Sequence, residues 1–198
     1  MQTVYLIRHG EIPQSKPRRF IGQSDLPLTE IGREQIARTA HSLAARSVGR
    51  IVTSPLKRCL ESGHIIGNRL RLPDIEAVSD LQEISLGAWE GLTVEQVCSD
   101  FPEEYTARGS DIAGFRPSGG ESFSDLLNRV WPAFDSIVTD ADSPIAIVAH
   151  AGVNRVLLCR ILGMPLANLF RLDQNYGCIN VIHREGTAYR VACLNLQP

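Results

Sequence analysis

Two histidines of this sequence each follow a short apolar run and lie just before a glycine. Residues 3–7 end at Arg8 and His9, and residues 144–149 end at His150. Runs of this length fit buried parallel strands, and the ligand crevices of open α/β sheets lie at the carboxyl ends of such strands. An imidazole can act as a nucleophile, and a guanidinium binds an oxyanion through two parallel hydrogen bonds. These residues therefore indicate a site for a dianion such as phosphate.

A second arginine and a carboxylate could complete such a site. Arg58 lies one turn inside a helix that is expected to begin with Ser54 as N-cap and Pro55 at the first helical position. Its side chain should lean back toward the preceding strand. Glu83 lies in an apolar segment, where desolvation favours the neutral carboxyl and makes it a candidate proton donor. Each residue alone also has a simpler interpretation, as a strand-ending histidine, a surface arginine or a solvated glutamate.

The elements expected to position these residues alternate between strands and helices. Strands are predicted at residues 3–8, 50–53, 75–78 and 143–149, and helices from Thr29, Ser54, Ser122 and about Val153. Pro132 should kink or restart the helix that runs from Ser122 to about Thr139. The tail is predicted to form a β-hairpin around Glu185 and Gly186.

One long segment follows no regular pattern. Residues 93–120 are polar and rich in turn-forming residues. We interpret them as part of an inserted cap of short helices, spanning about residues 85–121, and not as a separate domain. The length of 198 residues and the 43% hydrophobic content fit a single domain over residues 1–198.

Composition narrows the class of partner. The formal net charge of −2 does not favour nucleic acid or an anionic membrane as a partner, although arginine supplies 18 of the 20 basic residues. Five scattered cysteines without CxxC spacing favour a reducing, cytoplasmic setting. No signal peptide or spanning segment is recognisable, and the spacings typical of metal sites and P-loops are missing. We expect no metal or cofactor.

The motifs together resemble one family, the histidine phosphatase superfamily, also called the phosphoglycerate mutase-like family. The resemblance covers nearly the whole chain. It rests on Arg8-His9-Gly10-Glu11, residues 22–29, Ser54-Pro55-Leu56-Lys57-Arg58-Cys59, Glu83, Gly119-Gly120-Glu121-Ser122 and Val148-Ala149-His150-Ala151-Gly152. With the predicted elements, it implies a three-layer α/β/α sandwich with a mostly parallel central sheet and a small cap.

The resemblance also implies roles for individual residues. His9 is expected to attack phosphorus and form a phosphohistidine, Arg8, Arg58 and His150 to bind the phosphoryl oxygens, and Glu83 to protonate the leaving oxygen. The remaining expected substrate-binding residues are Ser15, Gly22, Gln23 and Ala151. Ile12 and Ser15 replace the hydroxyl residue and the asparagine that usually follow the signature, so phosphate affinity or substrate orientation could differ here.

The expected substrate is a small phosphorylated metabolite. Residues 170–174, Gly177-Cys178 and the loop from Pro117 to Phe123 resemble the α-ribazole phosphatase branch, which suggests α-ribazole 5'-phosphate and a link to cobalamin synthesis; sugar phosphates and phosphoglycerates stay open. The alternatives are a phosphoglycerate-type mutase and a protein that binds a phosphorylated ligand without turnover. Mutases of the family carry Glu-Arg-x-Tyr-Gly where this chain has residues 82–87, and a longer tail, so hydrolysis is favoured. A homodimer is possible.

Overall fold

The computed structural model describes residues 1–13 and 17–198, in which six strands form one sheet. The strands are β1 (Gln2–Arg8), β2 (Arg50–Thr53), β3 (Ile75–Ala77), β4 (Ile145–Ala149), β5 (Ile179–Glu185) and β6 (Ala188–Leu196). Their order is β3-β2-β4-β1-β5-β6, in which the first four run parallel and the hairpin of β5 and β6 is antiparallel. The predicted mostly parallel sheet is confirmed.

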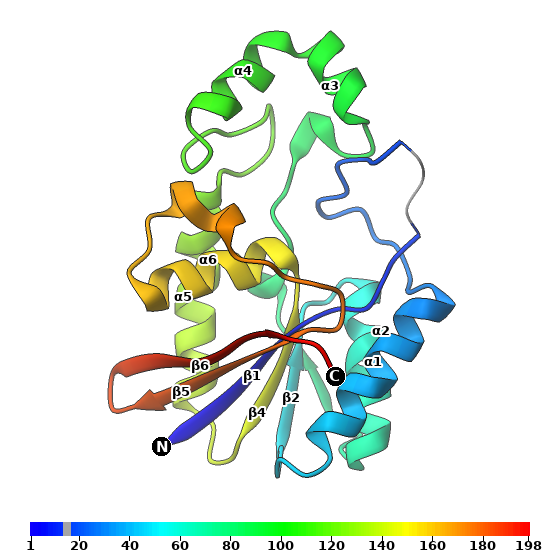
Figure 1. The fold of residues 1–198 in the computed structure, drawn as a ribbon, viewed down its shortest axis with the longest axis vertical. Coiled ribbons are helices and arrows are strands. Elements are labelled where there is room, and N and C mark those ends of the chain that lie inside the picture. Colours follow the sequence, from blue (N-terminus) through cyan, green and yellow to red (C-terminus); the bar gives the residue numbers. More distant parts are fainter. Residues whose placement is uncertain (14–16) are drawn as a thin grey trace.

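Helices cover both faces of this sheet. Helices α1 (Glu30–Leu43) and α2 (Lys57–Leu70) lie on one side, and α5 (Phe123–Thr139) and α6 (Ala151–Leu162) lie on the other (Figure 1). Successive side chains of β1 point to opposite faces: Val4 and Leu6 join the core with α5 and α6, whereas Tyr5 and Ile7 join the core with α1 and α2. The three-layer architecture follows from this alternation.

The predicted start of α2 is wrong, and so is a restart of α5 at Pro132, whereas the kink predicted there as the alternative stays a prediction. Helix α2 begins at Lys57 and not at Pro55, because the N–H of Ser54 still pairs with Val148 of β4 (3.0 Å) and extends the strand. The Ser54 hydroxyl accepts from the N–H of Leu56 (3.4 Å) and also contacts His150 (2.8 Å). Helix α5 continues through Pro132 without restarting, because Val130 and Phe134 on either side of the proline are both buried in the same core. The cap at Ser122 is as predicted, since its side chain accepts a hydrogen bond from the N–H of Asp125.

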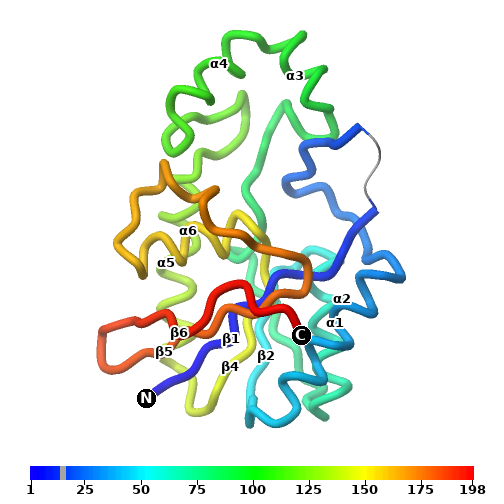
Figure 2. The backbone as a smooth tube through the Cα atoms, in the orientation of Figure 1, coloured from blue at the N-terminus to red at the C-terminus, as the bar shows by residue number. Residues whose placement is uncertain are grey.

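The cap segment stands apart from the sheet (Figure 2). It carries η2 (Gly87–Trp89), α3 (Val94–Asp100) and α4 (Pro102–Ser110), and Trp89 at its centre is fully buried between the rings of Phe20 and Phe115. The remaining short helices are η1 (Ser79–Leu81) and η3 (Leu166–Arg171). Among the described residues, no helix is both long and apolar enough to cross a membrane.

Candidate active site

A cavity of about 830 Å³ opens at the carboxyl ends of β1 and β4, between the sheet and the cap. Arg8 and Ala149 are paired in the register of these two parallel strands, so His9 and His150 leave the sheet side by side. Their ring centroids lie 5.2 Å apart. We call the part of the cavity lined by Arg8, His9, Arg58, Glu83 and Gly152 its inner end. The structure thus brings the predicted reactive residues together, as parallel strand order requires.

His9 is held in one tautomer. Its Nδ1 lies 2.7 Å from the carbonyl oxygen of Gly10, which can only accept a hydrogen bond, so Nδ1 carries the proton and Nε2 keeps its lone pair. Burial, reinforced by the nearby Arg8 and Arg58, holds the pKa of His9 well below its ordinary value. A neutral imidazole with an unprotonated Nε2 is the form that a nucleophile needs.

Arg8 is fixed from two sides. Its guanidinium lies over the ring of Tyr176, with 3.7 Å between Cζ and the ring centroid, and its Nη1 donates to the carbonyl oxygen of Gln174. Its Nε is buried and has no hydrogen-bond partner among the described residues. Such a donor is costly unless an acceptor is supplied, so Arg8 is prepared to bind an anion.

Arg58 is the most constrained cation of the inner end, with 1% of its surface exposed. Its Nη1 and Nη2 donate to the carbonyl oxygens of Ser24 (2.7 Å) and Gly22 (2.8 Å), and its Nε donates to Nδ1 of His150 (3.2 Å). Nε2 of His150 therefore carries the proton and donates to the Ser54 hydroxyl (2.8 Å). Burial, followed by the charge of Arg58, holds the pKa of His150 well below its ordinary value.

Glu83 approaches the inner end from the loop before the cap. Its Oε2 accepts a hydrogen bond from the N–H of Gly152 in the first turn of α6 (3.1 Å), and its Oε1 accepts one from the N–H of Ile84 (3.0 Å). A Cβ at position 152 would lie only 2.4 Å from Glu83 Oε1. Glycine at position 152 leaves the space in which the carboxyl reaches the helix N-terminus, where the helix dipole favours it.

The loop after β1 provides two of the predicted substrate-binding residues. Gly22, at a φ of 51°, lines the cavity and its carbonyl oxygen holds Arg58. Gln23 is used differently, because its Nε2 donates to the carbonyl oxygen of Glu83 (2.9 Å). The structure thus places Gln23 as a contact of the Glu83 backbone, and a direct contact with substrate stays a prediction.

The other predicted contacts lie around the same inner end. Ala151 begins α6 and lines the cavity, where the N-terminal N–H groups of a helix favour an anion. Ser15 lies outside the described residues. Ile12, which replaces a hydroxyl residue, is buried in the cavity wall.

Residues that the sequence interpretation missed support the cationic groups. Tyr176 contacts Arg8 and also lies 5.6 Å from His9 between ring centroids. The carboxamide of Gln174 bonds to Asn154 (3.0 Å) and Asn180 (2.8 Å) in a buried network behind Arg8. The signal in the sequence was an aromatic residue, Tyr176, followed by Gly177 just before the predicted hairpin. In the structure Gly177 has a φ of 68°, and the strand after it pairs with β1.

Away from the inner end, the cavity wall is rich in aromatic and basic side chains, and we call this part its outer end. These side chains come from the cap, from the loop after β1, from the start of α5, from α6 and from η3: Arg18, Arg19, Phe20, Tyr105, Arg108, Phe115, Phe123, Arg155 and Phe170. Phe170 is half exposed, and the Cζ atoms of Arg155 and Arg108 lie 5.4 and 5.8 Å from its ring centroid. No group of three His, Cys, Asp or Glu side chains suited to a metal ion occurs in the described part of the chain.

Comparisons with known proteins find relatives that match most of the chain. The profile of the histidine phosphatase superfamily (branch 1) matches residues 4–197. The chain is 33% identical over 176 residues to a glucosyl-3-phosphoglycerate phosphatase of Mycolicibacterium vanbaalenii, covering 85% of this chain and 77% of that protein. It is 32% identical over 178 residues to a bifunctional protein of Mycobacterium tuberculosis, covering 89% of this chain but only 48% of that protein. The α-ribazole phosphatase of Shigella flexneri superposes with a TM-score of 0.88 at 26% identity, covering 98% of this chain and 96% of that one.

Proposed function

This chain belongs to the histidine phosphatase superfamily, and on that premise we propose that it hydrolyses the phosphomonoester of a small metabolite through a phosphohistidine. The proposal is carried by one observation. His9, whose Nε2 is unprotonated, lines the cavity together with Arg8 and the buried Arg58, and Arg8 has a buried donor, its Nε, without a partner among the described residues. This arrangement suits a nucleophile and a phosphoryl dianion together.

Two displacements at phosphorus make up the proposed reaction. His9 Nε2 forms a bond to phosphorus while the bond from phosphorus to the ester oxygen breaks, and Glu83 gives its proton to the departing alkoxide. Water then attacks the phosphohistidine, its proton passes to the Glu83 carboxylate, and inorganic phosphate leaves with His9 restored. Arg8 and Arg58 stabilise the charge on the equatorial oxygens in both steps.

His150 stays in this proposal as a further phosphoryl ligand, because its ring lies 5.2 Å from that of His9. Both of its nitrogens are engaged, by Arg58 and by Ser54. A contact with the phosphoryl group therefore requires one of these bonds to be exchanged. His150 also orients the Arg58 guanidinium, because its Nδ1 accepts the hydrogen bond from Arg58 Nε.

Rapid quench with labelled substrate tests the nucleophile. Acid-labile label should appear on His9 and should vanish in His9→Ala, with turnover reduced by about four orders of magnitude or more. The variant His64→Ala, which changes an exposed histidine of α2, is the control and should keep both label and rate. Label on a serine, cysteine or aspartate would contradict the mechanism.

The side chains at the outer end of the cavity favour certain classes of leaving group. Its aromatic rings could hold the base of α-ribazole 5'-phosphate, which the motifs at residues 117–123 and 170–178 suggest. Arg108 and Arg155 on the same wall favour instead an acidic leaving group, such as a phosphoglycerate derivative. A panel of phosphomonoesters containing both classes, assayed at one pH, distinguishes the two candidates by kcat/KM.

The mutase and the binding protein are the alternative functions. A mutase must keep water from the phosphohistidine until a second substrate oxygen accepts the phosphoryl group. We expect release of inorganic phosphate with negligible interconversion of 2- and 3-phosphoglycerate, even with bisphosphoglycerate added. Mutase turnover that exceeds phosphate release would reverse this assignment. A pure binding protein would show neither reaction.

A further inference from the structure

The two ends of the cap segment are joined by hydrogen bonds between Ser85 and Glu121, and we call this junction the neck. The N–H of Glu121 donates to the carbonyl oxygen of Ser85 (2.8 Å), and the N–H of Ser85 donates to Oε2 of Glu121 (2.9 Å). Gly87, at a φ of 51°, lets the backbones pass closely, since a Cβ there would lie 2.2 Å from the carbonyl oxygen of Ser118. The chain thus enters the cap directly after Glu83 and returns at Glu121.

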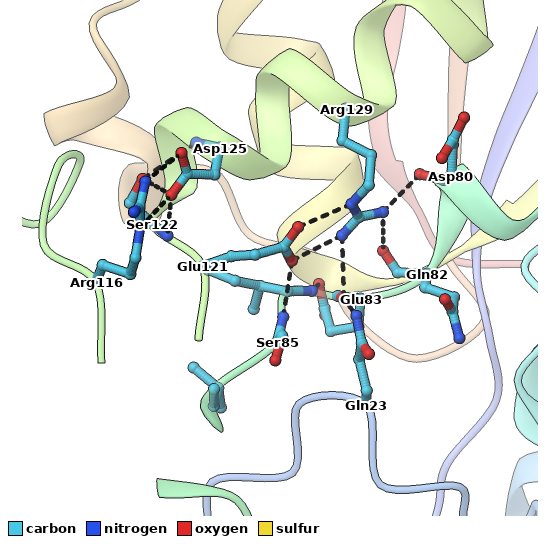
Figure 3. A network of polar contacts seen from close by, with 12 residues as sticks. Gln23, Asp80, Gln82, Glu83, Ser85, Arg116, Glu121, Ser122, Asp125 and Arg129 are labelled. Atoms are coloured by element: carbon cyan, nitrogen blue, oxygen red, sulfur yellow. Dashed lines mark hydrogen bonds and ion pairs between the residues drawn. The ribbon is translucent and has the colours of Figure 1, made fainter. Parts of the chain in front are cut away.

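Arg129 of α5 binds both sides of this neck (Figure 3). Its Nε and Nη2 donate to the two carboxylate oxygens of Glu121, each at 2.8 Å. Its Nη1 donates to the carbonyl oxygens of Asp80 (2.7 Å) and Gln82 (3.2 Å), and its Nη2 also reaches that of Glu83 (3.4 Å). All three nitrogens of one guanidinium are therefore used on residues 80–83, which we call the Glu83 loop, and on the end of the cap.

These contacts are strong enough to fix the loop. The Arg129 and Glu121 side chains are 22% and 23% exposed, so solvent screens their bidentate ion pair only in part. The hydrogen bond to Arg129 holds the pKa of Glu121 below its ordinary value, against the opposing effect of burial. The carbonyl oxygens of Asp80, Gln82 and Glu83 accept hydrogen bonds from side chains, those of Arg129 and Gln23, so the position of the Glu83 loop depends on these donors.

We propose that Arg129 and Glu121 are positioning residues for the general acid Glu83. By joining both ends of the cap to α5, they hold the Glu83 backbone in place when the cap adapts to different leaving groups. This inference rests on the proposed function, because it acts through the proton that Glu83 delivers. If Arg129 and Glu121 position Glu83, their removal should lower kcat/KM more for esters with poor leaving groups than for esters with good ones. If their role were purely structural, both kinds of ester should be affected equally.

The experiment compares p-nitrophenyl phosphate, whose leaving group needs little protonation, with an alkyl phosphate such as glycerol 3-phosphate. The measured quantity is the ratio of kcat/KM for the aryl ester to that for the alkyl ester. Glu83→Gln should raise this ratio most. Arg129→Gln should raise it by about 10- to 100-fold, since a displacement of 1 Å is enough to misplace the acid. The double variant should match Glu83→Gln alone.

Arg116→Gln provides the matched control. Arg116 forms the same kind of bidentate pair with Asp125 (2.7 and 2.8 Å) near the start of α5, but it makes no contact with the Glu83 loop among the described residues. Its removal should leave the ratio unchanged. Glu121→Gln retains the shape of the neck and should raise the ratio less than Arg129→Gln does. It tests the same role if Arg129→Gln fails to fold.

The outcomes separate the two hypotheses. Suppose that Glu83→Gln raises the ratio, but that the Arg129 and Glu121 variants lower kcat/KM equally for both esters or leave it unchanged for both. The positioning role is then wrong, and the proposed mechanism stands. If Glu83→Gln leaves the ratio unchanged, the acid assignment fails, and the positioning role fails with it.

Discussion

The inner and outer ends of the cavity are built in different ways. At the inner end, His9 and Arg58 are 4% and 1% exposed, and Arg58 alone makes three hydrogen bonds. At the outer end, none of the nine residues of α4 is buried, and Phe170 is half exposed with two arginines near its ring. The groups proposed for chemistry are thus fixed by several contacts each, whereas the groups that meet the leaving group have few.

This difference separates reaction type from substrate choice. Buried donors with fixed geometry stabilise a phosphoryl transition state because they need no reorganisation during the reaction. Exposed side chains on a small cap can change without disturbing that geometry, provided that the neck at Glu121 and Arg129 stays closed. We therefore expect substitutions at the inner end to slow all substrates, and substitutions at the outer end to change the order of preference among them.

The largest effect expected from an inner-end substitution other than His9 is that of Arg58→Gln. It removes a charge from the phosphoryl group and also leaves the carbonyl oxygens of Gly22 and Ser24 without their donor. We expect kcat/KM to fall by roughly 10³-fold, by a similar factor for aryl and alkyl esters. Steady-state assays of both esters measure this. A loss confined to one leaving group would show that Arg58 takes part in substrate choice.

Gly152→Ala should have the next largest effect. The added methyl would displace the Glu83 carboxyl, which it would meet at 2.4 Å, while alanine in place of glycine favours the helix by roughly 0.5–1 kcal/mol. We expect kcat/KM for alkyl esters to fall by about tenfold or more without a fall in Tm. Thermal unfolding together with the two-ester assay checks this, and Gly109→Ala, where a Cβ meets no atom within 4 Å, is the control.

The sequence predicts the inner end of the cavity better than the outer end, because the strands that carry the inner end are buried. The apolar run before His9 and the one before His150 must be buried, and two adjacent parallel strands then bring both histidines to one edge of the sheet. The short polar bonds could not be predicted. Ser54 follows a helix-capping pattern and accepts from the N–H of Leu56 (3.4 Å), but its shorter bond is to His150 (2.8 Å). Tyr176 comes close to Arg8 because β5 pairs with β1.

Low pH should destabilise the inner end specifically. The pKa values of His9 and His150 in the folded protein lie below the ordinary value of 6.5, so the unfolded chain binds more protons as the pH falls below that value. The free energy of unfolding should therefore be unaffected by these groups above about pH 6.5 and should fall below it, by at most about 1.4 kcal/mol per pH unit for each histidine.

Urea unfolding of the wild type and of His9→Asn at pH 7.5 and 5.5 measures this contribution. The variant should lose less stability between the two pH values than the wild type does, whereas a change at the exposed His64 should not alter the difference. An equal loss in His9→Asn and wild type would show that His9 is not a source of the acid sensitivity.

The smallest effect is expected from Arg108→Gln, at the outer end. Arg108 lines the cavity from α4 and forms no ion pair with any described residue; its Cζ lies 5.8 Å from the ring centroid of Phe170. An exposed charge contact is worth up to about 1 kcal/mol, which corresponds to roughly fivefold in kcat/KM. We expect such a loss for 3-phosphoglycerate, whose carboxylate the guanidinium could contact, and almost none for glycerol 3-phosphate, which has the same carbon skeleton without that charge.

The control is Arg171→Gln, on the exposed end of η3, which should leave kcat/KM unchanged for both substrates. A loss of a hundredfold or more with glycerol 3-phosphate would mean that the cap arginine acts on the phosphoryl group, and the two ends of the cavity could then no longer be treated as separate.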